Sequence, residues 1–296
     1  MKVCMNIPEW GNRWIPQLRS VFEGMDVVDD PKEADLLFSA WCDGTVVEWS
    51  HKYPNKKLIV YARRYELRER AFMESVNWDS VDLLIFVSNY NWRLFEGLSS
   101  IFHMIGRPKK TAVIPNGVDL ESIPLREEHL ATAKIAMIAS NRWEKGHSLA
   151  LQVLFHLPKE YRLYVIGMPA SESYSICLSE YVDSLGLVDR VVYDGYISSG
   201  DVLEWLKDKQ CLLSTSISEG NPMNVIEAMA TGMPAFVHAW PGATGQFPTV
   251  FKRADEAADR IQGPYQNPSY YRSWVQDHYD LRSYWKLKKV VQEVLA

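Results

Sequence analysis

The segment SEGNPMNVIEAMATGMP, residues 218–234, combines two acidic residues with an apolar helical pattern. Glu219 lies beside a Gly-Asn-Pro turn, and Glu227 follows after seven intervening residues, within the apolar run. The pattern predicts a helix that begins just after Glu219 and holds Glu227 about two turns further on. Residues typical of helix ends flank this helix, with Asn221 as N-cap, Pro222 at the first helical position, and Gly232 and Pro234 after its end.

The predicted helix follows the apolar run CLLSTS, residues 211–216, which is typical of a buried strand. In open α/β sheets, ligands bind in the crevice outside the carboxyl ends of the strands. A helix N-terminus at that edge offers backbone N–H groups and a positive dipole end, which suit a phosphate or sugar hydroxyls. Glu219 can accept hydrogen bonds from sugar hydroxyls, and Glu227 can reach a ribose diol. The spacing alone is weak evidence, because two acids in such a segment are also ordinary solvated residues.

Apolar runs alternate with helical patterns along the whole chain, which predicts βαβ units and doubly wound parallel sheets. In the first half, strands are expected at 2–7, 34–41, 57–62, 81–88 and 111–115, and helices at 13–24 and 89–106. In the second half, strands are expected at 133–140, 161–168, 190–196, 210–216 and 233–239, and helices at 147–157, 171–186, 199–209 and 222–232. We therefore predict an α/β protein with two Rossmann-like domains.

The domain boundary is expected within IPNGVDLESIP, residues 114–124, where two prolines and an Asn-Gly pair interrupt the pattern. We assign residues 1–118 to an N-terminal domain and 119–280 to a C-terminal domain. Residues 281–296 include an amphipathic helix, which we expect to pack back on the N-terminal domain.

Composition excludes some functions. The chain has 296 residues, 47% of them apolar, and a net charge of −5, which argues against broad nucleic-acid binding. A local basic cluster remains, and a solvated face is the favoured interpretation of it. Its members are Lys52, Lys56, Lys57, Arg63, Arg64, Arg68 and Arg70.

The cysteine spacing and the N-terminal sequence indicate the cellular compartment of the protein. Four cysteines lie far apart with no C-x-x-C pair, so we expect neither a disulfide framework nor a cysteine metal site. The opening MKVCMNIPEW is typical of a strand rather than a signal peptide, and no run of 18 apolar residues predicts a transmembrane segment. A cytoplasmic location is expected.

The segment 218–234 resembles the signature of glycosyltransferase family 4, EG-x-P-x-x-x-x-EAMA-x-G-x-P after a strand. Four other elements follow the family's order. IPNGVD at 114–119 is similar to its inter-domain link, and ASNRWEKGHSLAL at 139–151 to its Arg-x-x-x-Lys-Gly element; YVIGM at 164–168 and VVYDGYIS at 191–198 are similar to the two strands that follow. The resemblance covers residues 114–240 well and the N-terminal part only as a fold pattern.

The resemblance implies the GT-B fold, in which two Rossmann-like domains face each other across a central cleft. It implies a hexosyltransferase-type enzyme that moves a sugar from a nucleotide-diphosphate sugar to an acceptor, with retention of configuration. Arg142 and Lys145 would meet the diphosphate, Glu219 the donor sugar and Glu227 the ribose. Together, Glu219, Arg142 and Lys145 are the candidate catalytic residues. Further donor contacts would come from Gly220, Asn221 and Met223, and base contacts from Tyr196 or Ile197. Independently of the resemblance, Gly11 would let the backbone approach the donor phosphates.

No metal or cofactor is expected beyond the nucleotide-sugar substrate. The acid pair nearest to an Asp-x-Asp motif, Asp29 and Asp30, lies in a predicted surface loop. Cations and a helix N-terminus can stabilise a leaving diphosphate without a metal ion.

The acceptor is expected in the N-terminal domain and stays open as a glycan, a lipid-linked molecule or another hydroxyl compound. NIPEWGNRW stands where the family carries a Gly-Gly loop, and no catalytic histidine can be assigned. Trp10 and Trp14 are candidates for sugar stacking, and Arg63 and Arg64 for binding an acidic group on the acceptor.

Three alternatives remain open. One is a sugar-nucleotide epimerase of the same architecture, which would need more acid–base residues than the sequence offers. A second is a catalytically degenerate nucleotide-sugar-binding module, against which the joint presence of Arg142, Lys145, Glu219 and Glu227 argues. The third is a DNA-base glycosyltransferase, which the basic cluster permits and the overall acidity disfavours.

Overall fold

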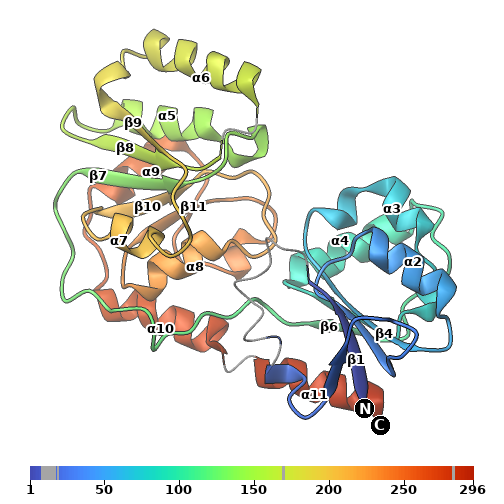
Figure 1. Ribbon diagram of the computed structural model, residues 1–296. Coiled ribbons are helices and arrows are strands. Elements are labelled where there is room, and N and C mark those ends of the chain that lie inside the picture. The colour runs from blue at the N-terminus through green and yellow to red at the C-terminus, as the bar shows by residue number, and fades with distance from the viewer. Residues whose placement is uncertain (8–17, 19, 169–170, 282–283) are drawn as a thin grey trace. The chain divides into compact units, whose positions relative to one another are not determined.

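A computed structural model gives the structure of the chain and describes residues 1–7, 18, 20–168, 171–281 and 284–296 (Figure 1). Contacts divide it into two compact units. The first unit comprises Met1–Gly117 and Leu281–Ala296, and the second comprises Val118–Asp280. Each unit is an α/β structure built on one parallel sheet.

The second unit contains a six-stranded sheet in the order β12-β11-β10-β7-β8-β9, with every neighbouring pair parallel. Its strands are β7 (Lys134–Ile138), β8 (Arg162–Ile166), β9 (Val191–Gly195), β10 (Cys211–Ser214), β11 (Ala235–His238) and β12 (Val250–Phe251). This is the Rossmann order, and the direction of winding reverses between β7 and β10. The crevice expected to bind ligands therefore lies where the chain leaves these two central strands.

Helices cover both faces of this sheet (Figure 1). Helices α5 (His147–His156), α6 (Glu172–Ser184) and α9 (Ala254–Ile261) share one apolar core with the strands. Helices α7 (Val202–Leu206), α8 (Met223–Ala230) and α10 (Pro268–Tyr279) lie on the other face. Because both faces are covered, the strands β7, β8, β10 and β11 are largely buried, which explains their nearly continuous apolar sequence, whereas β9 is exposed from Tyr193 to Gly195.

The first unit has a six-stranded parallel sheet in the order β2-β1-β3-β4-β5-β6. Its strands are β1 (Lys2–Asn6), β2 (Asp26–Val28), β3 (Leu36–Ser39), β4 (Lys57–Ala62), β5 (Leu83–Phe86) and β6 (Thr111–Val113). This order is flavodoxin-like, with the switch point between β1 and β3. At that point the side-chain amide of Asn6 donates to the hydroxyl of Ser39 at 2.9 Å.

Two apolar clusters cover the faces of this sheet. One includes residues of α2 (Gly44–Lys52), α3 (Arg70–Ser75) and α4 (Asn89–Ser99). The other includes Leu18, Val21 and Phe22 together with α11 (Tyr284–Leu295), whose Leu287 and Val291 are fully buried. The C-terminal helix is therefore part of the first unit's core.

The ten predicted strands are present, but the two short edge strands β2 and β12 and the helices α2, α3, α9 and α10 were not predicted. The helix predicted at 89–106 ends at Ser99, because Phe102 and Met104 pack against the core from a non-helical segment. Half of the predicted helix 13–24 lies outside the described residues. Among the helices that the structure describes, none has the length and apolar character needed to cross a bilayer.

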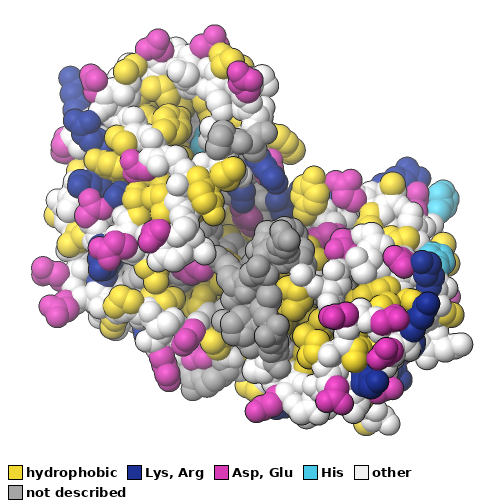
Figure 2. Space-filling view, in the orientation of Figure 1, with side chains coloured by type: hydrophobic (Ala, Val, Ile, Leu, Met, Phe, Trp, Pro, Cys, Tyr) yellow, Lys and Arg dark blue, Asp and Glu magenta, His cyan; other side chains and the backbone are white. Residues whose placement is uncertain are grey.

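The basic cluster of the first unit is largely occupied by internal contacts. The ammonium of Lys56 donates to the carbonyl oxygens of Lys32 and Ala34 at 2.8 and 2.6 Å. Lys57 pairs with Asp82 at 3.8 Å. Acidic and basic side chains are also intermixed on the face shown in Figure 2. Such pairing supports the solvated-face interpretation over a nucleic-acid surface.

Candidate functional site

An ion pair lies at the switch point of the second unit. Lys145 ends the 3₁₀ turn Trp143–Lys145 that follows β7, and Glu219 lies in the segment that follows β10. The ammonium of Lys145 is 2.6 Å from a carboxylate oxygen of Glu219. The two side chains are only 24% and 11% exposed, so the pair is partly screened from water. The structure therefore brings together two of the three candidate catalytic residues.

Backbone contacts hold the Lys145 turn against the end of β10. The N–H of Ile217 donates to the carbonyl of Glu144 at 2.9 Å, and the hydroxyl of Thr215 donates to the carbonyl of Lys145 at 3.0 Å. Gly146 has φ +65°, and a Cβ there would lie 2.2 Å from the carbonyl oxygen of Thr215. The close approach of the two segments therefore requires glycine directly after Lys145.

The helix α8 begins at the same edge, but not as predicted. Its N-cap is Pro222, whose side chain cannot accept a hydrogen bond, so the prediction that Asn221 caps the helix was wrong. The side-chain amide of Asn221 instead donates to Gln246 at 3.3 Å, and Gln246 donates to the carbonyl of Gly220 at 3.0 Å. The N-cap residue of α8 therefore supplies no side-chain cap, although the N–H of Val225 in the first turn donates to the side-chain oxygen of Asn224 at 3.0 Å. The positive end of the helix still suits an anion.

Two further residues of α8 bear on the site. The side-chain amide of Asn224 donates to the carbonyl of Ile138 at 2.8 Å and so ties the start of α8 to the end of β7. Glu227 is half-buried and is the fifth residue of α8. It therefore lies about one turn inside the helix rather than the predicted two.

Arg142 and Lys145 are closer in sequence than the resembled element requires. Only Trp143 and Glu144 separate them, whereas the Arg-x-x-x-Lys pattern has three intervening residues. The Arg142 side chain is exposed, while its backbone N–H donates to the carbonyl of Ser140 at 2.7 Å. Its guanidinium is therefore presented to solvent from an ordered turn.

A cavity of about 340 Å³ lies at the carboxyl ends of β8 and β9, under α6. It is lined by Asn141, Val165, Gly167, Ser175, Leu178, Ser179, Tyr193 and Gly195. Tyr196 and Ile197 follow directly after β9, and the Tyr196 side chain is 67% exposed. Since three strand spacings separate β10 from β9, Tyr196 and Glu219 are roughly 14 Å apart along this edge. The edge is therefore long enough for an extended ligand.

His147, the first residue of α5, was not singled out from the sequence. Its side chain is 2% exposed, and its ring lies 6.0 Å from that of Tyr174. Burial lowers the pKa of His147 to about 4, and the neighbouring Lys145 charge acts in the same direction. The imidazole is therefore neutral near pH 7, directly behind the Lys145 turn.

Sequence comparison places this edge in a known family. Residues 126–272 match the family model of glycosyl transferases group 1. The matched range contains the Lys145–Glu219 pair, α8 and the cavity. The chain is a glycosyltransferase with a group 1 domain. No curated protein sequence matches it significantly.

Solved structures give the fold of this glycosyltransferase. HepE from Anabaena in complex with UDP-glucose has a TM-score of 0.75 and 16% identity, with 97% of this chain and 84% of HepE covered. The lipopolysaccharide outer core galactosyltransferase WaaB has a TM-score of 0.71 and 15% identity, with 99% of each chain covered. Sucrose-phosphate synthase from Thermosynechococcus elongatus has a TM-score of 0.68 and 17% identity, with 88% and 74% covered. At these identities the likeness establishes the GT-B fold.

In the first unit of the glycosyltransferase, Arg63 is buried rather than exposed to solvent. Its guanidinium carbon lies 4.6 Å from the centroid of the Trp41 ring and 4.3 Å from that of Tyr61. It also donates to the side-chain oxygen of Asn116. Burial raises the pKa of nearby Glu66 to about 7, and the Arg63 charge only partly opposes this. Arg63 therefore contributes to the interior of the first unit.

The remaining predicted site residues divide into two groups. Arg64 is half-buried beside Arg63. Gly11, Trp10 and Trp14 lie outside the described residues. Across the described ranges, no three His, Cys, Asp or Glu side chains are grouped so that they could hold a metal ion.

Proposed function

We propose that this glycosyltransferase binds a nucleotide-diphosphate sugar at the carboxyl edge of the second unit and transfers the sugar to an acceptor hydroxyl. The observation that carries the proposal is the Lys145–Glu219 pair, which lies at the switch point beside the start of α8. A cation, a carboxylate and a helix N-terminus suit a diphosphate joined to a sugar.

The positive groups would hold the diphosphate and stabilise it as it leaves. Lys145 has three N–H donors, so it can bind a phosphate oxygen while it keeps a hydrogen bond to Glu219. The exposed Arg142 guanidinium can supply two parallel hydrogen bonds. Backbone N–H groups near Gly220 and Met223 would complete the contacts.

The remaining groups would orient the sugar and the nucleoside. Glu219 would accept hydrogen bonds from the donor sugar, with Asn221 beside it, and Glu227 would bind the ribose diol. Tyr196 and Ile197 would meet the base at the far end of the edge. HepE holds UDP-glucose, and we therefore favour a UDP-sugar as the donor.

We further propose retention of configuration and no requirement for a metal ion. Lys145 already neutralises Glu219, which suits Glu219 to positioning and electrostatic stabilisation better than to nucleophilic attack. Arg142, Lys145 and the start of α8 together supply the positive charge that a metal ion would otherwise bring.

The acceptor would bind to the first unit. Arg64, Trp10 and Trp14 remain candidates, and a glycan or lipid-linked hydroxyl acceptor is favoured. A nucleic-acid acceptor is disfavoured, because the net charge is −5 and several basic residues are paired internally. The buried thiols of Cys4, Cys42 and Cys211 suit the reducing cytoplasm.

The test is a thermal-shift screen with UDP-, GDP-, ADP- and TDP-sugars in the presence of EDTA. A ligand at 100 times its Kd adds about 2.7 kcal/mol to stability, which is readily seen as a higher Tm. We expect one nucleotide class to raise the Tm clearly above the others. If no nucleotide sugar changes the Tm, and none binds by calorimetry, the proposed function is wrong.

A further inference from the structure

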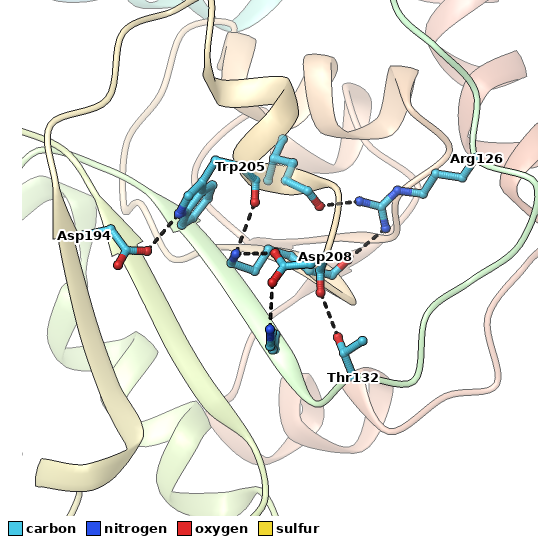
Figure 3. Close-up of polar contacts among 8 residues, drawn as sticks. Arg126, Thr132, Asp194, Trp205 and Asp208 are labelled. Carbon is cyan, nitrogen blue, oxygen red and sulfur yellow. Dashed lines mark hydrogen bonds and ion pairs between the residues drawn. The ribbon is translucent and has the colours of Figure 1, made fainter.

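The short helix α7 is fixed by cationic side chains at its C-terminal end (Figure 3). The guanidinium of Arg126 donates to the carbonyls of Lys209 and Leu206 at 2.8 and 2.6 Å. The ammonium of Lys209 donates to the carbonyl of Trp205 at 3.1 Å. Carbonyls in the last turn of a helix have no partner within the helix, and cations stabilise them.

Lys209 is itself enclosed. Its residue is 4% exposed, and its ammonium lies 4.6 Å from the ring of Trp205 and 4.8 Å from that of Tyr164 on β8. It also pairs with Asp208, which binds Lys134 of β7 at 2.7 Å. These contacts attach α7 to the central strands of the sheet, so a helix of only five residues has a fixed position.

One further contact connects α7 to the strand before it. The indole N–H of Trp205 donates to a carboxylate oxygen of Asp194 at 2.8 Å (Figure 3). Asp194 is the penultimate residue of β9, and Gly195 follows with φ +75°. The bond therefore links the end of β9 to α7 across the intervening segment 195–201, which carries Tyr196 and Ile197.

We infer that Trp205 is a positioning residue: through its hydrogen bond to Asp194, it holds the segment 195–201 in the conformation that meets the donor's base and so sets base selectivity. This inference rests on the proposed function. The bond joins an exposed carboxylate to a half-buried indole and adds little to stability, but it restricts the segment that presents Tyr196 and Ile197. A base that fits the restricted segment therefore binds more tightly than a base that requires the segment to move.

Three variants separate the hydrogen bond from the packing of the indole ring. Trp205→Phe keeps an aromatic ring over Lys209 and removes the N–H donor. Asp194→Ala removes the acceptor, whereas Asp194→Asn keeps an acceptor oxygen. Trp285→Phe is the matched control, because Trp285 lies 57% exposed on α11 in the other unit. Calorimetry gives the Kd of UDP, GDP and ADP for each protein, and thermal unfolding checks the fold.

We expect the ratio of Kd values between the best and the second-best nucleotide to fall about three- to ten-fold in Trp205→Phe and Asp194→Ala, the range of one net hydrogen bond. The double variant should lose no more than either single variant, since both remove one interaction. Asp194→Asn should retain most of the wild-type ratio of Kd values, and Trp285→Phe should retain the wild-type ratio unchanged.

Other outcomes overturn the inference. An unchanged ratio, or an equal loss of affinity for all three nucleotides, would mean that Trp205 serves only the packing of α7. A wild-type protein that binds the three nucleotides equally would have no base selectivity for Trp205 to set. Absence of nucleotide binding by the wild type would refute the proposed function itself, which distinguishes the two failures.

Discussion

The ammonium of Lys145 lies 2.6 Å from the carboxylate of Glu219, although the two residues are 74 positions apart in the sequence. The two residues meet because β7 and β10 are neighbouring parallel strands and both residues follow the carboxyl ends of these strands. Each of the two charges stabilises the other. Under the proposed function, the donor diphosphate would meet a cation that is already oriented by its carboxylate partner.

The first prediction concerns the two cations. Arg142→Ala and Lys145→Ala should each lower the transition-state stabilisation of transfer by about 2–4 kcal/mol, because each removes a charge-assisted contact to the leaving diphosphate. Steady-state transfer kinetics measure the loss. Lys159→Ala is the control, since Lys159 is exposed before β8 at the opposite end of the sheet. Normal turnover in both site variants would remove these residues from the donor site.

The second prediction concerns metal ions. Transfer should continue at its full rate after dialysis against EDTA, because protein cations and the start of α8 meet the diphosphate charge. The rate is measured with EDTA, and again after addition of magnesium or manganese. Loss of activity that either metal restores would contradict this assignment.

The third prediction compares the contributions of Arg63 and Arg64 to stability. Arg63→Ala should lower the free energy of unfolding by about 2–4 kcal/mol, since it removes a buried guanidinium that contacts two aromatic rings and donates to Asn116. Arg64→Ala should leave stability nearly unchanged. Urea unfolding of the two variants gives the comparison, and equal stabilities would show that the Arg63 contacts contribute nothing.

The fourth prediction concerns the stability of the fold at acidic pH. The pKa of His147 is about 4 in the folded protein, below its usual value near 6.5. Because the folded-state pKa is depressed, His147 favours folding above pH 6.5, and roughly 3 kcal/mol of this contribution is lost as the pH falls toward 4. His147→Phe removes this titration and should be less sensitive to acid than the wild type. Thermal unfolding of both proteins from pH 7 to pH 4 measures the difference.

A second buried group, the carboxyl of Glu66, also titrates in the pH range of that experiment. Its pKa is raised to about 7 by burial, so it acts in the opposite direction and favours folding as the pH falls. The wild type and the variant share Glu66, and the difference between their Tm values therefore isolates His147. A difference that stays constant across the pH range would show that His147 does not titrate as its burial implies.

The apolar strands and the helix around Glu227 could be predicted from the sequence, since they depend on local periodicity. Contacts between distant residues could not. Asn221 has the residue type of an N-cap, but its side chain binds Gln246, whose position depends on the fold. The edge strands β2 and β12 have three and two residues, too few for a periodic signal.

The burial of charged residues could not be predicted from the sequence either. The sequence RRYELRER is charged enough to be typical of a surface loop, yet Arg63 and Glu66 lie in the interior. Only the folded unit brings the rings of Trp41 and Tyr61 next to the Arg63 guanidinium. In the second unit, the proximity of Gly146 to Thr215 explains why glycine follows Lys145, and this reason exists only once β7 and β10 pair.

A crystal structure of the glycosyltransferase with UDP, or with the nucleoside diphosphate selected by the thermal-shift screen, tests the central claim most directly. We predict phosphate oxygens within hydrogen-bond distance of the Lys145 ammonium and the Arg142 guanidinium, with the ribose at Glu227. A nucleotide bound elsewhere, or a diphosphate that contacts neither cation, would contradict the claim.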